Sequence, residues 1–106
     1  MAKNSKTFSF EFFPPKTASG QEKVISLGKE FESVPAEYYS VTFGAGGSTQ
    51  QGTIDTCRSL FNATKVPIAP HISGIGSDKS SIKSMLQLYK DEGFKKLVVL
   101  RGDLPS

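Results

Sequence analysis

The feature that most constrains this chain is the regular recurrence of a strand-like run followed by a helical stretch. Strand-like runs open near residues 8, 38, 67 and 96, so one strand-helix unit recurs about every 30 residues, the length of a βαβ unit. Strict alternation of strands and helices predicts a parallel sheet with right-handed crossovers. The chain is therefore expected to be an α/β protein with the element order βαβαβαβ.

The expected strands and helices follow from the spacing of apolar residues. The strands cover residues 7–13, 38–43, 67–72 and 96–101. Three sets of apolar residues between them recur at helical spacing: Val24, Leu27, Phe31 and Val34; Ile54, Cys57, Leu60 and Phe61; Ile82, Met85, Leu86 and Tyr89. Pro35 should end the first helix and Gly93 should follow the third, while Ser48 or Thr49 would cap the second.

Two folds satisfy this order of elements, an open doubly wound sheet and a (β/α)8 barrel, and the pattern alone does not separate them. A barrel needs eight strands and typically about 250 residues. These 106 residues would then supply the first half of a barrel, apparently truncated, with an unpaired strand edge at residues 97–100. We expect such a half barrel, taken alone, to self-associate as a homo-oligomer.

Composition argues against several classes of protein. The formal net charge is +3 and the 13 Lys and Arg residues are scattered, so nucleic-acid binding is not indicated. One cysteine and one histidine allow neither a disulfide nor a metal cluster within this chain, which fits a reducing, cytoplasmic location. No apolar run approaches the ~20 residues that cross a bilayer, and the polar first residues do not resemble a signal peptide.

Polar residues stand at the end of each expected strand, where parallel α/β folds bind their ligands. Successive ends supply Glu11, Thr42 with the glycine-rich segment 44–47, His71, and Arg101-Gly102-Asp103. Because the carboxyl ends of parallel strands meet at one edge of the sheet, we expect these groups to converge on one pocket.

Glu11 is the first candidate for proton transfer. It lies among Phe8, Phe10, Phe12 and Phe13, an apolar setting that would favour the protonated carboxyl group and so a general acid. An exposed or paired strand carboxylate is the alternative interpretation.

The other candidates also have plain structural interpretations. The segment 44–49 could approach an anion through its backbone amides, or could simply form a tight turn. His71 could bond a ligand, or could be a satisfied core residue. The glycine-rich loop and Arg101 would together suffice for a non-catalytic phosphate- or nucleotide-binding module, the main alternative function. Arg101-Gly102-Asp103 is also the cell-adhesion tripeptide, but its position at a strand end in a chain without a secretion signal argues against that role.

Four segments together resemble the methylenetetrahydrofolate reductases. They are Phe8-Ser9-Phe10-Glu11-Phe12-Phe13-Pro14-Pro15-Lys16, Ser40-Val41-Thr42-Phe43-Gly44-Ala45-Gly46-Gly47-Ser48-Thr49, Ala69-Pro70-His71 and Leu100-Arg101-Gly102-Asp103-Leu104-Pro105. The resemblance runs from about Phe8 to the C-terminus, in the order and approximate spacing of the family. It implies that residues 1–106 are the N-terminal part of a single catalytic (β/α)8 barrel and are inactive alone.

The resemblance also implies an activity. FAD would take a hydride from NADH or NADPH and pass it to 5,10-methylenetetrahydrofolate, giving 5-methyltetrahydrofolate for one-carbon and methionine metabolism. Glu11 would be the general acid, and Asp103 would face the folate and stabilise the cation formed before hydride transfer. The residues expected against the flavin or nicotinamide are Thr42, Phe43, Ala45, His71, Leu100, Arg101, Gly102 and Asp103.

Two positions depart from the family pattern. Phe43 stands where many members have Tyr, so its contact with the flavin would be apolar. Ser73-Gly74 stands where a Thr-Cys pair is common, so contacts from that turn are not carried over.

Overall fold

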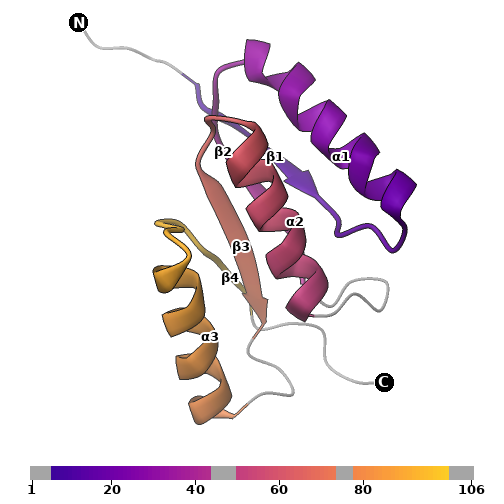
Figure 1. Ribbon diagram of the computed structural model, residues 1–106. Coiled ribbons are helices and arrows are strands. Elements are labelled where there is room, and N and C mark those ends of the chain that lie inside the picture. The colour runs from indigo at the N-terminus through magenta and orange to yellow at the C-terminus, as the bar shows by residue number, and fades with distance from the viewer. Residues whose placement is uncertain (1–5, 44–49, 74–77, 101–106) are drawn as a thin grey trace, which may run out of the picture.

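The computed structural model describes residues 6–43, 50–73 and 78–100. Strands and helices alternate along the chain, as the recurrence of apolar runs predicted (Figure 1). The elements are β1 (Phe8–Phe12), α1 (Ala18–Glu30), the 3-10 helix η1 (Phe31–Ser33), β2 (Ala36–Val41), α2 (Gln50–Ala63), β3 (Ile68–Ser73), α3 (Lys79–Asp91) and β4 (Val98–Leu100).

The sheet has the order β1-β2-β3-β4, and every neighbouring pair is parallel. Each crossover therefore moves one strand in the same direction, and right-handed crossovers then place all the helices on one face. Figure 1 shows α2 lying across β2 and β3, with α1 and α3 on either side of it. A doubly wound sheet would reverse direction and cover both faces. The described arrangement is that of the first half of a (β/α)8 barrel.

The core lies between the sheet and the three helices. Strand residues of alternating position point toward the helices and meet apolar residues of α2 and α3. Its buried members are Phe12, Tyr39, Val41, Ile54, Cys57, Leu60, Ile68, Ile72, Met85, Tyr89 and Phe94. Burial at this interface fixes the strands against the helices and leaves the opposite face of the sheet for the candidate site.

Tyr39 is the most completely enclosed aromatic residue of this core. Its ring contacts Phe12 edge-on, with ring centroids 5.2 Å apart, and its hydroxyl donates a 2.7 Å hydrogen bond to the Gly28 carbonyl oxygen. At Gly28, a Cβ atom would stand 2.6 Å from a methyl carbon of Leu60. A larger residue at this position would displace the buried Leu60 side chain, so Gly28 allows α1 to approach α2 closely, and Tyr39 bonds the backbone of α1 at that point.

The helix ends follow rules that apolar spacing does not reveal. α1 begins at Ala18 because the Thr17 hydroxyl accepts a hydrogen bond from the Gly20 amide, and Asp78 caps α3 in the same way through Ser81. Gly93 follows α3 with φ of +92°, as expected for a glycine after a helix. The caps proposed at Ser48 or Thr49 lie outside the described residues.

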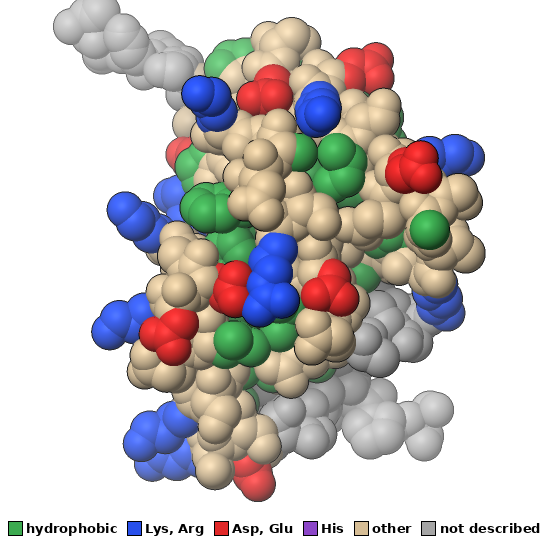
Figure 2. Space-filling model, in the orientation of Figure 1, with side chains coloured by type: hydrophobic (Ala, Val, Ile, Leu, Met, Phe, Trp, Pro, Cys, Tyr) green, Lys and Arg blue, Asp and Glu red, His purple; other side chains and the backbone are tan. Residues whose placement is uncertain are grey.

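The predicted apolar stripes are only partly buried. Leu27, Phe61 and Leu86 are all more than a third exposed, while the small residue Gly28 is buried instead. On the face that Figure 2 shows, acidic and basic side chains are interspersed rather than gathered by sign. One pair of opposite charge is well defined, since Arg58 on α2 donates to both carboxylate oxygens of Glu92. No helix in the described ranges is long and apolar enough to cross a membrane.

Two buried tyrosines provide a matched test of this packing. Tyr39→Phe should lower the free energy of unfolding by about 1–2 kcal/mol, because it removes the hydrogen bond to Gly28. Tyr89→Phe should be neutral or stabilising, since the Tyr89 hydroxyl is buried without a partner among the described residues. Urea unfolding of the three proteins measures the difference, and equal losses in both variants would contradict the assignment.

Candidate functional site

The candidate site lies at the carboxyl ends of β1, β2 and β3, on the face of the sheet away from the helices. Phe10 and Phe12 pack into the core on the helix side, so Glu11 between them points to the other face. Glu11 pairs with Ser40 of β2, and Ser40 pairs in turn with Ala69 of β3. The register therefore places these three residues in one row across that face.

The short side chains in this row bring two distant residues together. Glu11 and His71 lie on strands that are not neighbours, yet Glu11 Oε1 is 3.5 Å from His71 Nε2. Ser40 and Ala69 are both buried, and neither has a side chain long enough to stand between them. Sequence reasoning did not identify these two small residues as part of the site. The feature of the sequence that could have revealed them is a small residue at paired positions of two adjacent strands.

The expected apolar burial of Glu11 is wrong. Its side chain is 53% exposed and faces the imidazole of His71 rather than the surrounding phenylalanines. The reason is strand alternation, because neighbouring residues of a strand point to opposite faces of the sheet. Phe10 and Phe12 thus build the core behind Glu11. The alternative interpretation, a paired and exposed strand carboxylate, describes its environment.

His71 is buried, with a side chain only 7% exposed. Its Nε2 has no hydrogen-bond partner within the described residues, although the Glu11 carboxylate stands close by. Burial lowers the pKa of His71 below its usual 6.5, and the nearby charge of Glu11 opposes part of that effect. The imidazole is therefore neutral at physiological pH, with one nitrogen available to accept a hydrogen bond.

Thr42 directly follows β2, and both its amide and its carbonyl group form hydrogen bonds within the protein. Its amide donates to the Phe12 carbonyl oxygen at 3.0 Å, and its carbonyl oxygen accepts from the Thr53 hydroxyl of α2 at 2.8 Å. The Thr42 hydroxyl is buried and has no partner among the described residues. Thr42 lies one residue beyond Val41, as His71 lies one beyond Pro70, and Val41 pairs with Pro70. The unpartnered hydroxyl and imidazole are thus on adjacent strand ends.

The remaining predicted residues divide into two groups. Phe43 is partly buried against the core, and Leu100 ends β4, paired with Ser73 and nearly half exposed. Ala45, Arg101, Gly102 and Asp103 lie outside the described residues, so the contribution of the fourth strand end stays a prediction. The structure brings together Glu11, Thr42 and His71 from three of the four strand ends.

These residues offer groups for hydrogen bonding and proton transfer. His71 Nε2 is buried, unpartnered among the described residues and 3.5 Å from the accessible Glu11 carboxylate, and the unpartnered Thr42 hydroxyl belongs to the adjacent strand end. Across the described part of the chain, no three His, Cys, Asp or Glu residues gather as a metal site would require.

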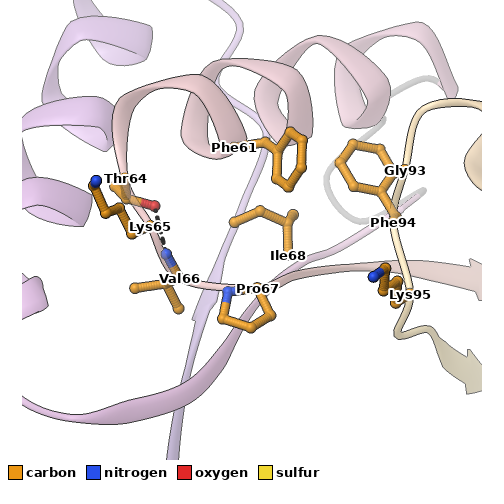
Figure 3. A pocket seen from close by; sticks show the side chains of 9 residues that line it. All are labelled: Phe61, Thr64, Lys65, Val66, Pro67, Ile68, Gly93, Phe94 and Lys95. Atoms are coloured by element: carbon orange, nitrogen blue, oxygen red, sulfur yellow. Dashed lines mark hydrogen bonds between the residues drawn. The ribbon is translucent and has the colours of Figure 1, made fainter.

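A cavity of about 430 Å³ lies at the other end of the strands, where β3 begins. Figure 3 shows Phe61 and Phe94 beside each other above Ile68, with Val66 and Pro67 on the opposite side. The two phenylalanine rings meet edge to face with centroids 5.5 Å apart. Ligands of parallel α/β folds bind at the carboxyl ends, so we assign this apolar cavity no part in the candidate site.

A family model described as methylenetetrahydrofolate reductase matches residues 1–106. The chain belongs to the methylenetetrahydrofolate reductase family. It is similar to a 5,10-methylenetetrahydrofolate reductase of Pectobacterium carotovorum, at 33% identity over 92% of this chain and 33% of the relative. It is also similar to methylenetetrahydrofolate reductase 2 of Schizosaccharomyces pombe, at 34% identity over 92% of this chain and 15% of the relative.

A plant relative has a more specific name. It is methylenetetrahydrofolate reductase (NADH) 1 of Arabidopsis thaliana, 33% identical over 92% of this chain and 17% of the relative. This chain spans about a third of the length of the bacterial relatives and a smaller share of the yeast and plant ones. The family membership agrees with the resemblance drawn from the sequence.

The buried imidazole predicts how stability depends on pH. The unfolded chain binds a proton at His71 near pH 6.5, whereas the folded chain binds it only at lower pH, so unfolding is favoured as the pH falls through this window. Urea unfolding at several pH values should therefore show stability decreasing below about pH 6.5.

His71→Gln supplies the control, because it should abolish that decrease. Asp78 and Glu92, whose pKa values are lowered by bonds to Ser81 and Arg58, lose their contributions only in more acidic solution, below their usual 3.8 and 4.5. An unchanged pH profile in the variant would show that His71 is not responsible.

Proposed function

We propose that this chain forms the N-terminal part of a catalytic barrel that reduces 5,10-methylenetetrahydrofolate to 5-methyltetrahydrofolate with FAD and NADH or NADPH. The observation that carries the proposal is the convergence of Glu11, Thr42 and His71 at three strand ends in a member of the reductase family. In a (β/α)8 barrel these ends form the catalytic face.

Glu11 is the proposed general acid. Opening the five-membered ring of the folate requires a proton on the departing nitrogen, and a carboxyl group at the catalytic face can donate it. The half-exposed side chain of Glu11 is accessible to a substrate bound over the sheet. A module that only held phosphate would have no use for an acid placed in this way.

Thr42 and His71 fit a bound flavin. The buried Thr42 hydroxyl lacks a partner among the described residues, and an unsatisfied group of this kind costs free energy until a ligand bonds it. The flavin, when bound, would carry the hydride between the nicotinamide and the folate. Phe43 and Leu100 would add apolar contacts at the ends of β2 and β4.

The other proposed contacts come from the family resemblance. Ala45, Arg101 and Gly102 would approach the flavin, and Asp103 would contact both the flavin and the folate. The Arabidopsis relative is named for NADH, and either NADH or NADPH is a proposed reductant for this chain.

A variant of Glu11 separates the two half-reactions. In a complete reductase that contains this chain, Glu11→Gln should leave flavin reduction by NADH or NADPH nearly intact. It should slow reduction of methylenetetrahydrofolate by ~10²- to 10⁴-fold, because only that step needs a proton donor. Stopped-flow absorbance of the flavin follows each half-reaction. Equal losses in both would make Glu11 structural.

Thr42→Val tests flavin binding. The variant should fold with unchanged stability, because the hydroxyl it removes has no protein partner among the described residues. In the complete reductase its FAD dissociation constant should rise roughly five- to tenfold, the equivalent of about 1 kcal/mol for one hydrogen bond.

The matched control is Thr56→Val, whose buried hydroxyl contacts Gln21 on the helix side of the sheet. That substitution should leave FAD affinity unchanged. If both variants bound FAD equally well, the Thr42 hydroxyl would have no role in the cofactor site.

A further inference from the structure

His71 combines a buried acceptor atom with a half-exposed carboxylate neighbour. The imidazole is almost completely buried, and its Nε2 has no hydrogen-bond partner among the described residues. The side chain beside that atom is Glu11, which is half exposed and whose Oε1 lies 3.5 Å from Nε2. A buried polar atom without a partner requires an explanation, and the nearest chemistry is a carboxyl group.

The distance between Glu11 Oε1 and His71 Nε2 is short enough for a hydrogen bond to form if the carboxyl group rotates. A distance of 3.5 Å is slightly beyond the usual 2.7–3.2 Å. Catalytic hydrogen bonds are often longer before substrate binds. Burial holds the His71 ring in place, whereas the side chain of Glu11 is half exposed, so a small rotation of the carboxyl group would bring the two atoms within hydrogen-bond distance.

We infer that His71 is the positioning residue for Glu11, and that His71 Nε2 and the Glu11 carboxyl group hold one proton between them. This inference rests on the proposed role of Glu11 as general acid. When Glu11 delivers the proton, its O–H bond breaks and an N–H bond forms on the substrate. The pair then has one proton fewer, and water restores that proton at the half-exposed Glu11 carboxylate.

Few titratable groups share this face of the sheet within the described residues. β2 presents Tyr38, Ser40 and Thr42 there, β3 presents Ala69, and β4 presents Val98 opposite His71. Tyr38 is the titratable side chain of this set, and it pairs with Ser9, toward the beginning of the strands. Among the described residues, Glu11 is the charged group that acts on His71, and burial keeps the ring neutral so that Nε2 can accept.

The sole histidine of the chain makes the test direct. Nuclear magnetic resonance of the 106-residue chain can follow the imidazole nitrogens of His71 and the carboxyl carbon of Glu11 across a pH titration. We expect the Glu11 signal to show an inflection at the pH where His71 titrates, because one proton affects both groups. Glu11→Gln should lower the pKa of His71, since it removes the charge that favours the imidazolium form.

Two further proteins complete the experiment. Glu22→Gln, at an exposed position of α1, should leave the His71 titration unchanged. His71→Leu should remove the extra inflection from the Glu11 signal. If that variant fails to fold by circular dichroism, the exposed Glu11→Gln substitution still decides the question.

The inference is overturned if Glu11→Gln leaves the His71 titration where it was, or if the Glu11 signal does not respond when His71 titrates. Neither measurement depends on reductase activity. The two claims can therefore fail separately. If a Glu11→Gln reductase reduced the folate at the full rate, the proposed role of Glu11 as general acid would be wrong. The sharing of a proton between Glu11 and His71 would still hold if the titrations of the chain had shown it.

Discussion

The enclosure of Tyr39 determines the geometry on which the rest of this structure depends. Its ring is fully buried between β1 and the helices, and its hydroxyl bonds the backbone of α1 where Gly28 allows close contact with Leu60. One side chain of β2 therefore contacts both β1 and α1 at the point where α1 meets α2. The ladder through β2 holds β1 and β3 in register, and this packing holds that sheet against the helices with Glu11 and His71 on its other face.

The two faces of the sheet differ in the size of their side chains. Toward the helices, large residues such as Phe12, Tyr39 and Ile68 fill the core. On the other face, the short side chains of Ser40 and Ala69 leave room for one long side chain to extend over them. Contact between residues on non-adjacent strands follows from this contrast, and not from strand pairing alone.

The sequence was sufficient to predict the four strands and the three helices, because the spacing of apolar residues and the turn residues between them are local features of the chain. It was insufficient for the environment of Glu11. The four surrounding phenylalanines suggested burial, but alternation directs Phe10 and Phe12 away from the carboxylate. Leu27 likewise fits a helical stripe and is nonetheless exposed, since the close contact at Gly28 decides which face of α1 packs. Strand alternation decides the first case, whereas packing between α1 and α2 decides the second, and no short window of sequence contains that packing.

The two backbone hydrogen bonds of Thr42 have a consequence for ligand affinity. Its amide is held by β1 and its carbonyl oxygen by the first turns of α2, so the residue has little conformational freedom left to lose. Ordering a loop residue on binding normally costs about 1 kcal/mol or more of entropy. The backbone of Thr42 is already ordered in the folded protein, so binding causes little further loss of conformational entropy there. A ligand that bonds the hydroxyl would meet a preorganised group, so less of the free energy of that bond would be spent on ordering the protein.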